Sequence, residues 1–275
     1  MNRNPSTQAP MNPRTVLITG ASAGIGDAFA EVFALEGFNV VLTARREDRL
    51  RAVAARLQER FGVQVHVVPA DLSAPGAAAT LWREVEARGL VIDALVNNAG
   101  YGIPGAFIAS DWPRHAALVQ VMIVSLAELT HLALPGMIAR GYGRIINIAS
   151  LAGLVPAPAG HTLYAASKAF VIKFSESLGA EVRASGVHVT ALCPGFTRSE
   201  FHDITGTRAK VAQLPPWMWM DAAAVARHGF DAVSAGIPVY VTGRINRVIA
   251  LFARILPQRL LVAAGRRVAG RYRQS

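Results

Sequence analysis

Tyr164 and Lys168 stand four residues apart in the segment Leu163–Phe170, which reads LYAASKAF. Its small residues favour a helix, and residues four apart share a helix face, so we expect the phenol beside the ammonium. A free phenol, with a pKa of about 10, is a poor acid or base at neutral pH. An ammonium about 4 Å away would supply the roughly 4 kcal/mol needed to lower that pKa by about 3. The pair therefore predicts acid–base chemistry at Tyr164, unless it merely occupies a solvated helix face.

A glycine-rich turn lies near the start of the chain, where Thr19–Gly26 reads TGASAGIG. It follows an apolar, β-branched run and opens a helix-like one, as a dinucleotide-binding turn does. Glycines let the backbone approach a pyrophosphate, and free N–H groups at the helix start bind the anion. The spacing is G-x-x-x-G-x-G, and a strand-to-helix connection without a ligand is the alternative. The residues expected to bind the cofactor here are Gly20, Ser22, Ala23, Gly24, Ile25 and Gly26.

These groups need strands and helices to hold them, and the apolar pattern predicts both. Short β-branched segments alternate with longer helical ones, which is typical of βαβ units around a parallel sheet. The sequence thus predicts the α/β class, in one domain without an internal repeat. Strands are expected within 15–19, 38–44, 63–68, 92–100, 143–150, 187–195 and 238–242, and helices over 25–35, 47–61, 77–88, 113–140 (straight or bent), 162–184 and 221–235.

Composition limits the class of protein. Hydrophobic residues make up 52% of the 275 positions and charged residues 17%, which excludes disorder and indicates a well-filled core. Cys193 is the only cysteine, which excludes an intrachain disulfide and a cysteine-built zinc site and fits a cytoplasmic, reducing compartment. No metal is expected. Residues 1–13 lack the apolar segment of a secretory signal and are expected to be a flexible tail. No apolar run is expected to reach membrane-spanning length, since the best candidate, 116–134, contains polar residues.

Five motifs occur in one order along the chain: TGASAGIG, NNAG at 97–100, Ser150 in IASLAG, YAASK at 164–168, and CPG at 193–195. In this order and spacing they resemble the short-chain dehydrogenase/reductase family. The resemblance implies a catalytic domain over 14–243, of the Rossmann type, with a doubly wound, seven-stranded parallel sheet flanked by helices. It also implies a nicotinamide cofactor and hydride transfer between a carbonyl and an alcohol, with Tyr164, Lys168 and Ser150 as catalytic residues.

The resemblance assigns further roles. Lys168 would also bind the nicotinamide ribose, and Ser150 would hydrogen-bond the carbonyl oxygen that faces Tyr164. Asp71 and Leu72 would contact the adenine. The residues expected near the middle of the cofactor are Asn98, Ala99 and Gly100, and PGFTR at 194–198 brings Pro194, Gly195 and Thr197 to the nicotinamide carboxamide or the phosphates, although a Pro-Gly pair is also simply a turn.

The end of the second expected strand favours NADP(H) over NAD(H). In a dinucleotide fold a carboxylate at this point binds the ribose 2′-hydroxyl, whereas an arginine suits a 2′-phosphate. The chain reads VVLTARRED here, with Thr43 and Ala44 in place of a carboxylate, followed by Arg45 and Arg46. Because guanidinium groups bind phosphate through paired donors, Arg45 is predicted to be the main contact. The alternative is that both arginines only solvate the next helix.

One position departs from the family pattern. Many members carry a fourth catalytic residue, an asparagine on the long helix after NNAG, and counting from both sides leads to Met122. A thioether cannot donate a hydrogen bond. Ser125 could replace the amide, protons could reach Lys168 by water alone, or the protein could bind the cofactor without useful turnover. Met122 is also simply a good core residue.

Residues 196–220 form the least regular segment and are expected to be a loop or lid over the substrate. Its large apolar side chains, with Phe201 and Trp217 as the named contacts beside Ser150 and Tyr164, predict an apolar ketone or aldehyde. Alternatively they pack on the body or on another subunit. The resemblance also implies a homodimer or homotetramer.

The positive charge is concentrated in the C-terminal extension, 244–275. The chain has a net charge of +10, and this extension contains eight arginines and no acidic residue. Alternating apolar clusters and arginines suit an interfacial helix on anionic lipid. The alternative is a terminal helix that packs its apolar side on the domain. Nucleic acid is not expected as a partner, since no recognition motif is present.

The function predicted is that of an NADP(H)-dependent oxidoreductase, with a cofactor-binding scaffold or sensor as the alternative because of Met122.

Overall fold

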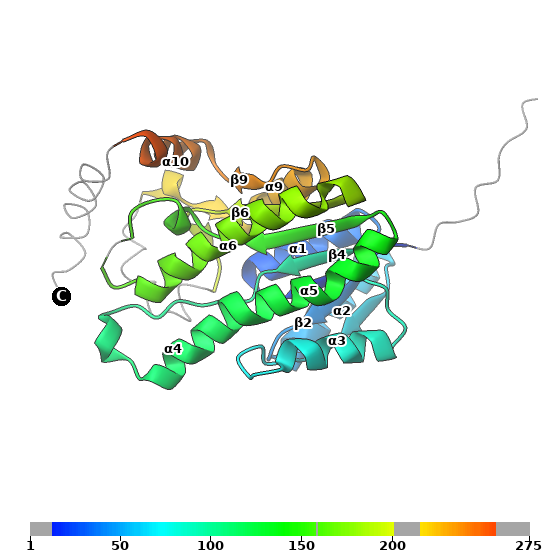
Figure 1. Ribbon diagram of the computed structural model, residues 1–275. Helices are drawn as coiled ribbons and strands as arrows, with labels where there is room; N and C mark the ends of the chain where they lie inside the picture. Colours follow the sequence, from blue (N-terminus) through cyan, green and yellow to red (C-terminus); the bar gives the residue numbers. More distant parts are fainter. Residues whose placement is uncertain (1–12, 158, 201–214, 257–275) are drawn as a thin grey trace, which may run out of the picture.

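Seven parallel strands form the central sheet of the computed structural model, which describes residues 13–157, 159–200 and 215–256 (Figure 1). The strand order is β3-β2-β1-β4-β5-β6-β9, and every neighbouring pair is parallel. The strands are β1 (Thr15–Thr19), β2 (Asn39–Thr43), β3 (Val65–Val67), β4 (Ala94–Asn97), β5 (Gly143–Ile148), β6 (Val187–Cys193) and β9 (Val239–Val241). The predicted seven-stranded sheet is confirmed.

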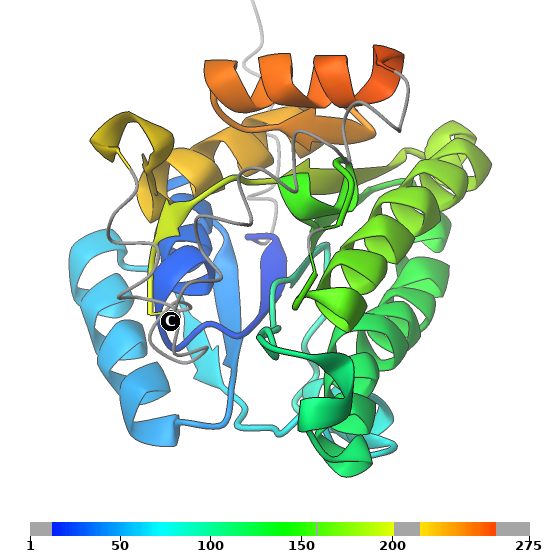
Figure 2. The ribbon, with the colours of Figure 1, turned by 90° about the vertical axis from the view of Figure 1, so that its left-hand side faces the viewer.

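Helices cover both faces of the sheet (Figures 1 and 2). One layer contains α1 (Gly24–Leu35), α2 (Glu47–Phe61) and α9 (Ala222–Ser234), and the other α3 (Ala77–Ala87), α5 (Ser125–Ala139) and α6 (Thr162–Val182). Successive strand side chains point to opposite faces. Val16 and Ile18 of β1 therefore pack with the first layer and Leu17 with the second. Burial on both faces explains why the strands are nearly continuous apolar runs.

The long helix predicted over 113–140 is present but irregular. It consists of α4 (Trp112–Val119), a wider π-helical turn at Gln120–Val124, and α5. By length and composition, the helix over Trp112–Ala139 could span a membrane, with a mean hydropathy of 1.8, which the sequence analysis did not expect. It is nevertheless a core element here: residues along it, including Leu118 and Leu129, are fully buried against the sheet.

The predicted substrate segment begins and ends on a pair of short strands that the sequence did not predict. β7 (Thr197–Arg198) pairs with β8 (Met220–Asp221), and the 3-10 turn Pro216–Met218 precedes β8. Phe201 and the rest of 201–214 lie outside the described residues. Trp219 packs its ring 5.8 Å from that of Phe196, whereas Trp217 is 61% exposed.

The last described helix, α10 (Arg244–Ile255), lies beside β9 at the edge of the molecule (Figure 1). One interpretation of the C-terminal sequence was a terminal helix that packs its apolar side on the domain. That interpretation is wrong for the described part of the extension, because the large apolar side chains of α10 are exposed. The tails at 1–12 and 257–275 lie outside the described residues.

Candidate active site

The predicted site residues gather where the carboxyl ends of neighbouring strands meet. Gly20 follows β1, Asn98 follows β4, Ser150 follows β5 and Pro194 follows β6, and these four strands include the centre of the sheet. In an open parallel sheet this edge is where ligands bind. The topology thus brings together motifs that are more than a hundred residues apart in the chain.

The glycine turn has the shape that a pyrophosphate requires. Gly20 and Gly24 adopt left-handed backbone conformations, with φ of 66° and 61°, which other residues rarely adopt. A Cβ on Gly26 would lie 2.3 Å from the carbonyl oxygen of Gly20, so only glycine fits there. Ala23, at the N-cap of α1, provides no side-chain cap. The first N–H groups of α1 are therefore not capped by the N-cap side chain, and a pyrophosphate could supply the acceptors.

Thr19 fixes this turn against the segment after β4. Its Oγ1 accepts hydrogen bonds from the backbone N–H groups of Asn98, at 2.9 Å, and Ala99, at 3.0 Å, and donates to the Val96 carbonyl. The Asn98 amide in turn donates to the carbonyl oxygens of Thr19, at 3.0 Å, and Gly20, at 3.2 Å. Asn98 therefore holds the turn in place. Thr19 was not among the predicted site residues, although its place at the end of an apolar strand, directly before the first glycine, is a usable signal.

Of the two predicted phosphate-binding arginines, Arg46 is the one that reaches the glycine turn. Its guanidinium donates to Ser22 Oγ at 3.0 and 3.3 Å and forms an exposed ion pair of 2.8 Å with Glu200. Arg45 lies close enough to Asp71 for its positive charge to lower the pKa of that carboxyl. The two arginines thus lie beside different neighbours of β2: Arg46 contacts the turn after β1, and Arg45 lies near the turn after β3.

Asp71, the predicted adenine contact, is held in a local turn. Its Oδ1 accepts hydrogen bonds from the Ser73 backbone N–H, at 3.0 Å, and from the Ser73 hydroxyl, at 2.7 Å. Burial would raise the pKa of Asp71, but these bonds and Arg45 outweigh it and hold the pKa below its usual value. The neighbouring Leu72 uses its carbonyl to accept from Ser125.

Ser150 and Tyr164 are brought into hydrogen-bond contact by β5 and α6. Ser150 caps the 3-10 turn Leu151–Gly153, where its Oγ accepts from the Ala152 N–H at 3.1 Å. Tyr164 stands in the first turn of α6, where the residue is half-buried and its hydroxyl lies on the buried side. That burial raises the pKa of Tyr164, and the hydrogen bond with Ser150 partly opposes the rise.

Lys168 is buried one turn further along α6. Its Nζ donates to the carbonyl oxygen of Ile148 at 2.7 Å and lies 5.7 Å from the centre of the Tyr164 ring. Burial lowers the pKa of Lys168 to about 8. The predicted lowering of the phenol pKa by this ammonium is wrong for the chain itself: burial raises the pKa of Tyr164, and Ser150 rather than Lys168 opposes it.

Gly153 allows the serine turn to lie directly on α6. A Cβ at this position would lie 2.7 Å from the carbonyl carbon of Lys168, closer than real Cβ contacts. Leu151 also donates to the carbonyl oxygen of Pro194 at 2.9 Å, which joins the serine turn to the segment after β6. The close approach of backbone to backbone at Gly153 is therefore a condition for the contact between Ser150 and Tyr164.

The segment after β6, which is predicted to approach the cofactor, is held by contacts of its own. Thr197 is buried, and its hydroxyl donates to the Gly195 carbonyl at 3.2 Å. A Cβ on Gly195 would lie 2.4 Å from the Asn246 amide nitrogen, so α10 begins directly on this segment. Gly195 is therefore required for the close packing of α10.

Met122 lies in the π-helical turn and is almost fully buried. Its sulfur is 3.9 Å from the Ser167 hydroxyl, and its side chain would lie 3.4 Å from a Cβ on Gly100. Ser125, offered as a substitute for the usual asparagine, donates instead to the Leu72 carbonyl at 2.9 Å and accepts from Gln120. Ser125 therefore does not face Lys168, and water remains the alternative route for protons.

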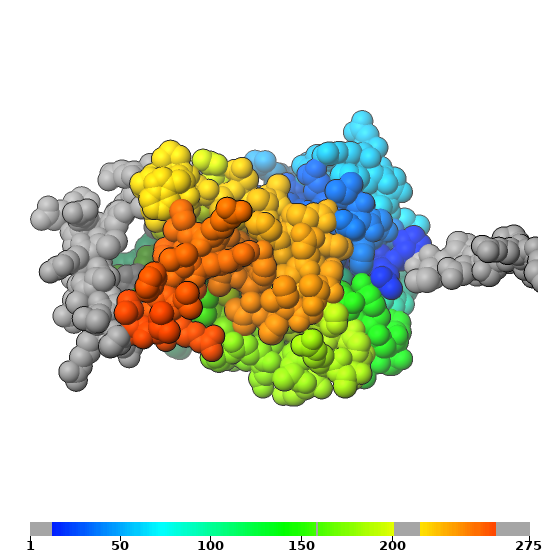
Figure 3. Space-filling view, turned by 90° about the horizontal axis from the view of Figure 1, so that it is seen from above, coloured from blue at the N-terminus to red at the C-terminus, as the bar shows by residue number. Residues whose placement is uncertain are grey.

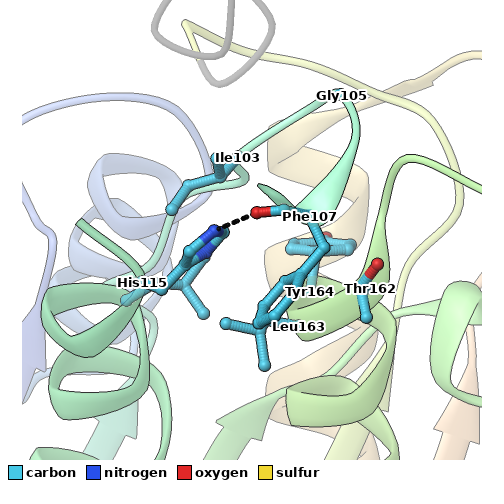
Figure 4. A pocket seen from close by; sticks show the side chains of 8 residues that line it. Ile103, Gly105, Phe107, His115, Thr162, Leu163 and Tyr164 are labelled. Atoms are coloured by element: carbon cyan, nitrogen blue, oxygen red, sulfur yellow. Dashed lines mark hydrogen bonds between the residues drawn. The ribbon is translucent and has the colours of Figure 1, made fainter. Parts of the chain in front are cut away.

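A small pocket opens beside Tyr164 (Figure 4). His115 closes one side, with its Nε2 2.9 Å from the Phe107 carbonyl oxygen, and its ring stacks on that of Phe107. Trp217 does not line this pocket. The lining residues, mostly apolar and missed by the sequence analysis apart from Tyr164, are Ile103, Gly105, Phe107, His115, Leu118, Thr162, Leu163 and Tyr164.

Comparison with known proteins agrees with this geometry. A family model described as short chain dehydrogenase matches residues 14–208. A very-long-chain 3-oxoacyl-CoA reductase of Anas platyrhynchos is 37% identical over 195 residues, which cover 69% of this chain and 61% of that protein. A 7beta-hydroxysteroid dehydrogenase of Collinsella aerofaciens is 35% identical over 181 residues, or 66% of this chain and 68% of that protein.

A solved structure is similar over most of its length. The short-chain dehydrogenase from Sphingobium yanoikuyae in complex with NADPH is 34% identical, with a TM-score of 0.78, and the match covers 86% of this chain and 91% of that chain. The chain spans less than two thirds of the Anas platyrhynchos protein. The family model, however, covers well over half of this chain. The chain therefore belongs to the short-chain dehydrogenase/reductase family.

Proposed function

We propose that this protein is an NADP(H)-dependent reductase that converts an apolar ketone or aldehyde to its alcohol. The single observation behind the proposal is that Ser150, Tyr164 and Lys168 meet at the sheet edge that also presents the glycine turn. Members of the family are oxidoreductases that act on alcohol and carbonyl groups with a nicotinamide cofactor.

The bound nicotinamide would supply the hydride, and the chain supplies the proton and the positioning. Tyr164 holds its proton at neutral pH, which is the form that a reduction needs. Because burial raises the pKa of Tyr164, release of that proton would depend on the positive charge of Lys168. Ser150 can donate a hydrogen bond to the carbonyl oxygen and hold it toward the phenol. Lys168, fixed on the Ile148 carbonyl, stabilises the phenolate left after proton transfer when its amine is charged.

The preference for NADP(H) rests on the arginines. Arg46 already places its guanidinium on Ser22 of the glycine turn, and Arg45 lies nearby. The ends of β1 and β2 carry no carboxylate that would repel a 2′-phosphate. Glu200 pairs with Arg46, but both side chains are about 40% exposed, and a phosphate can replace such an exposed partner.

The mostly apolar side chains around the pocket beside Tyr164 support an apolar substrate, although the space that they enclose is no larger than a water molecule. The pocket wall is made mostly of aliphatic and aromatic side chains, with His115 and Thr162 as polar exceptions. Relatives named for very-long-chain acyl and hydroxysteroid substrates support the same class. Trp217 and Phe201, from the segment 196–220, remain proposed contacts.

The alternative is a cofactor-binding scaffold or sensor with little turnover. It is favoured by Met122, whose thioether lies in the π-helical turn where the usual catalytic asparagine is expected. Under this alternative NADPH binds but no carbonyl compound is reduced.

The test is NADPH consumption against a panel of aliphatic, aromatic and steroid-like ketones and aldehydes. We expect turnover on several apolar members and weaker turnover with NADH. Tight NADPH binding without turnover on any compound, and no gain from Met122→Asn, would establish the scaffold instead.

We also propose a cytoplasmic homo-oligomer, a dimer or a tetramer. The helices α4, α5 and α6 and the π-helical turn between α4 and α5 expose large apolar side chains that a second copy could cover. Among them are Trp112, Val124, Ile138 and Phe170. Sedimentation velocity of the full chain tests the oligomer, and a monomer at micromolar concentration would contradict it.

A further inference from the structure

The helix α10 is seated on the domain by the side that carries its small residues. Asn246, Ala250 and Ala253 are its half-buried positions, and the Asn246 amide donates to the Thr242 carbonyl at 2.8 Å. Arg247 holds the same side, with Nε donating to the Val241 carbonyl at 3.0 Å. The helix is therefore anchored to the end of β9.

The opposite side of α10 is apolar and faces away from the domain. Figure 3 shows the helix on the outer surface of the molecule. Its large side chains Ile245, Val248, Ile249, Leu251, Phe252 and Ile255 are each between 37% and 64% exposed. Six such residues on one face of one helix form a continuous apolar stripe, and such stripes mark an interaction surface.

The charged residues of α10 itself are all positive. Arg244 and Arg254 are exposed, and the residues from 244 to 275 include eight arginines and no acidic residue. Long arginine side chains can extend to the headgroup level while the apolar side chains between them enter the acyl boundary.

We propose that α10 docks the protein on an anionic lipid surface, with the stripe in the interface and the arginines on the phosphates. A second copy of this chain fits the surface less well. A symmetric contact through α10 would bring two sets of arginines together without an acidic partner on either helix. The proposal does not depend on the proposed reaction, since no catalytic residue takes part.

Co-sedimentation of the full chain with lipid vesicles tests the proposal. We expect the protein to pellet with vesicles of phosphatidylcholine and phosphatidylglycerol, to pellet little with phosphatidylcholine alone, and to be released by salt. The double substitution Leu251→Glu and Phe252→Glu should lower the partition coefficient at least about tenfold. The matched control is Leu35→Glu with Val91→Glu, two positions of similar exposure on α1 and before β4, which should bind like the wild type.

Three results would overturn the proposal. The wild type could fail to pellet with anionic vesicles, or the α10 double variant could pellet equally well, which would place the contact elsewhere. The double substitution could also convert a dimer to a monomer in sedimentation velocity while vesicle binding is absent. That outcome would make the stripe an interface between copies. All four substituted side chains are exposed, and circular dichroism checks that both double variants are folded.

Discussion

The Nζ of Lys168 donates a 2.7 Å hydrogen bond to the carbonyl oxygen of Ile148, the last residue of β5. This bond ties α6 to the strand that ends two residues before Ser150. It also fixes a lysine in a position where burial lowers its pKa to about 8 from 10.5. The burial of Lys168 therefore affects the stability of the fold as well as the chemistry of the site.

Lys168 should make the stability of the domain depend on pH. Between about pH 8 and 10.5 the unfolded chain keeps a proton on Lys168 that the folded chain has released, so the free energy of unfolding rises with pH in this window. Relative to Lys168→Met, the rise should be on the order of 3 kcal/mol. Urea denaturation at several pH values measures it, and titrating groups that do not interact with Lys168 cancel in the difference. Cys193, whose pKa the charge of Lys168 lowers, is removed from the comparison by making both proteins with Cys193→Ala.

The control for this prediction is Lys173→Met, since Lys173 lies on the same helix with its side chain 80% exposed. The difference in the free energy of unfolding between Lys173→Met and the wild type should stay constant over the same pH range. If the difference in the free energy of unfolding were also independent of pH for Lys168→Met, that would contradict the account of a buried lysine.

Gly153→Ala should lower activity by separating Ser150 from Tyr164. The new methyl group would lie 2.7 Å from the Lys168 backbone, which cannot move without shifting α6. We expect a loss of about 1–3 kcal/mol in stability and at least a tenfold fall in kcat, with a smaller change in the Kd for NADPH. Gly179→Ala is the matched control on α6, because its methyl group meets Val189 at an ordinary 3.5 Å. Equal kcat values for the two variants would show that the close approach at Gly153 is not needed.

Arg46→Ala should weaken NADPH binding more than NADH binding. A charge-assisted hydrogen bond to the 2′-phosphate is worth about 1.5–3 kcal/mol, so KM for NADPH should rise roughly tenfold to a hundredfold. Arg51 is an exposed arginine on α2, the helix that begins directly after Arg46, and Arg51→Ala should change neither KM. Arg45→Ala decides between the sequence-based prediction, which made Arg45 the main contact, and the position of Arg46 on Ser22. If neither arginine affects the choice of cofactor, the NADP(H) proposal fails.

Thr19→Val should loosen the glycine turn without changing the size of the side chain. The valine would leave the N–H groups of Asn98 and Ala99 without their acceptor. We expect a loss of about 1–3 kcal/mol in stability and weaker NADPH binding. Thr19→Ser keeps the hydroxyl that accepts these hydrogen bonds, so this variant should retain most of the stability and most of the NADPH affinity. Calorimetric titration with NADPH measures the affinity, and thermal unfolding measures the stability. If Thr19→Val and Thr19→Ser had equal affinity and stability, Thr19 would not be part of the site.

The parts of the fold that the sequence predicted are those with a local cause. The strands are short, nearly continuous apolar runs, and α2 (Glu47–Phe61) has the predicted boundaries because a left-handed glycine, Gly62, follows it. The π-helical turn at Gln120–Val124 and the pairing of β7 with β8 were not predictable in this way. They depend on contacts between distant segments, which leave no periodic signal in the chain.

The site shows the same division. The motifs indicated which residue types would meet, and Ser150, Tyr164 and Lys168 do meet. The direction of the pKa shift at Tyr164 could not be predicted, because it depends on how deeply the hydroxyl is buried and on a hydrogen bond to Ser150. Phe107, in the 3-10 turn before α4, and His115, on α4, close the pocket but belong to no motif.

The most direct test of the central claim is the rate of NADPH-dependent carbonyl reduction by Tyr164→Phe, measured alongside its Kd for NADPH. Removing the hydroxyl deletes the proton donor and leaves the ring, so we expect kcat to fall by at least about a hundredfold while NADPH binding changes little. The kcat of Ser150→Ala should fall less, since this substitution removes only the group that positions the carbonyl oxygen. An undiminished kcat in Tyr164→Phe, with NADPH still bound, would contradict the role of this phenol as the proton donor.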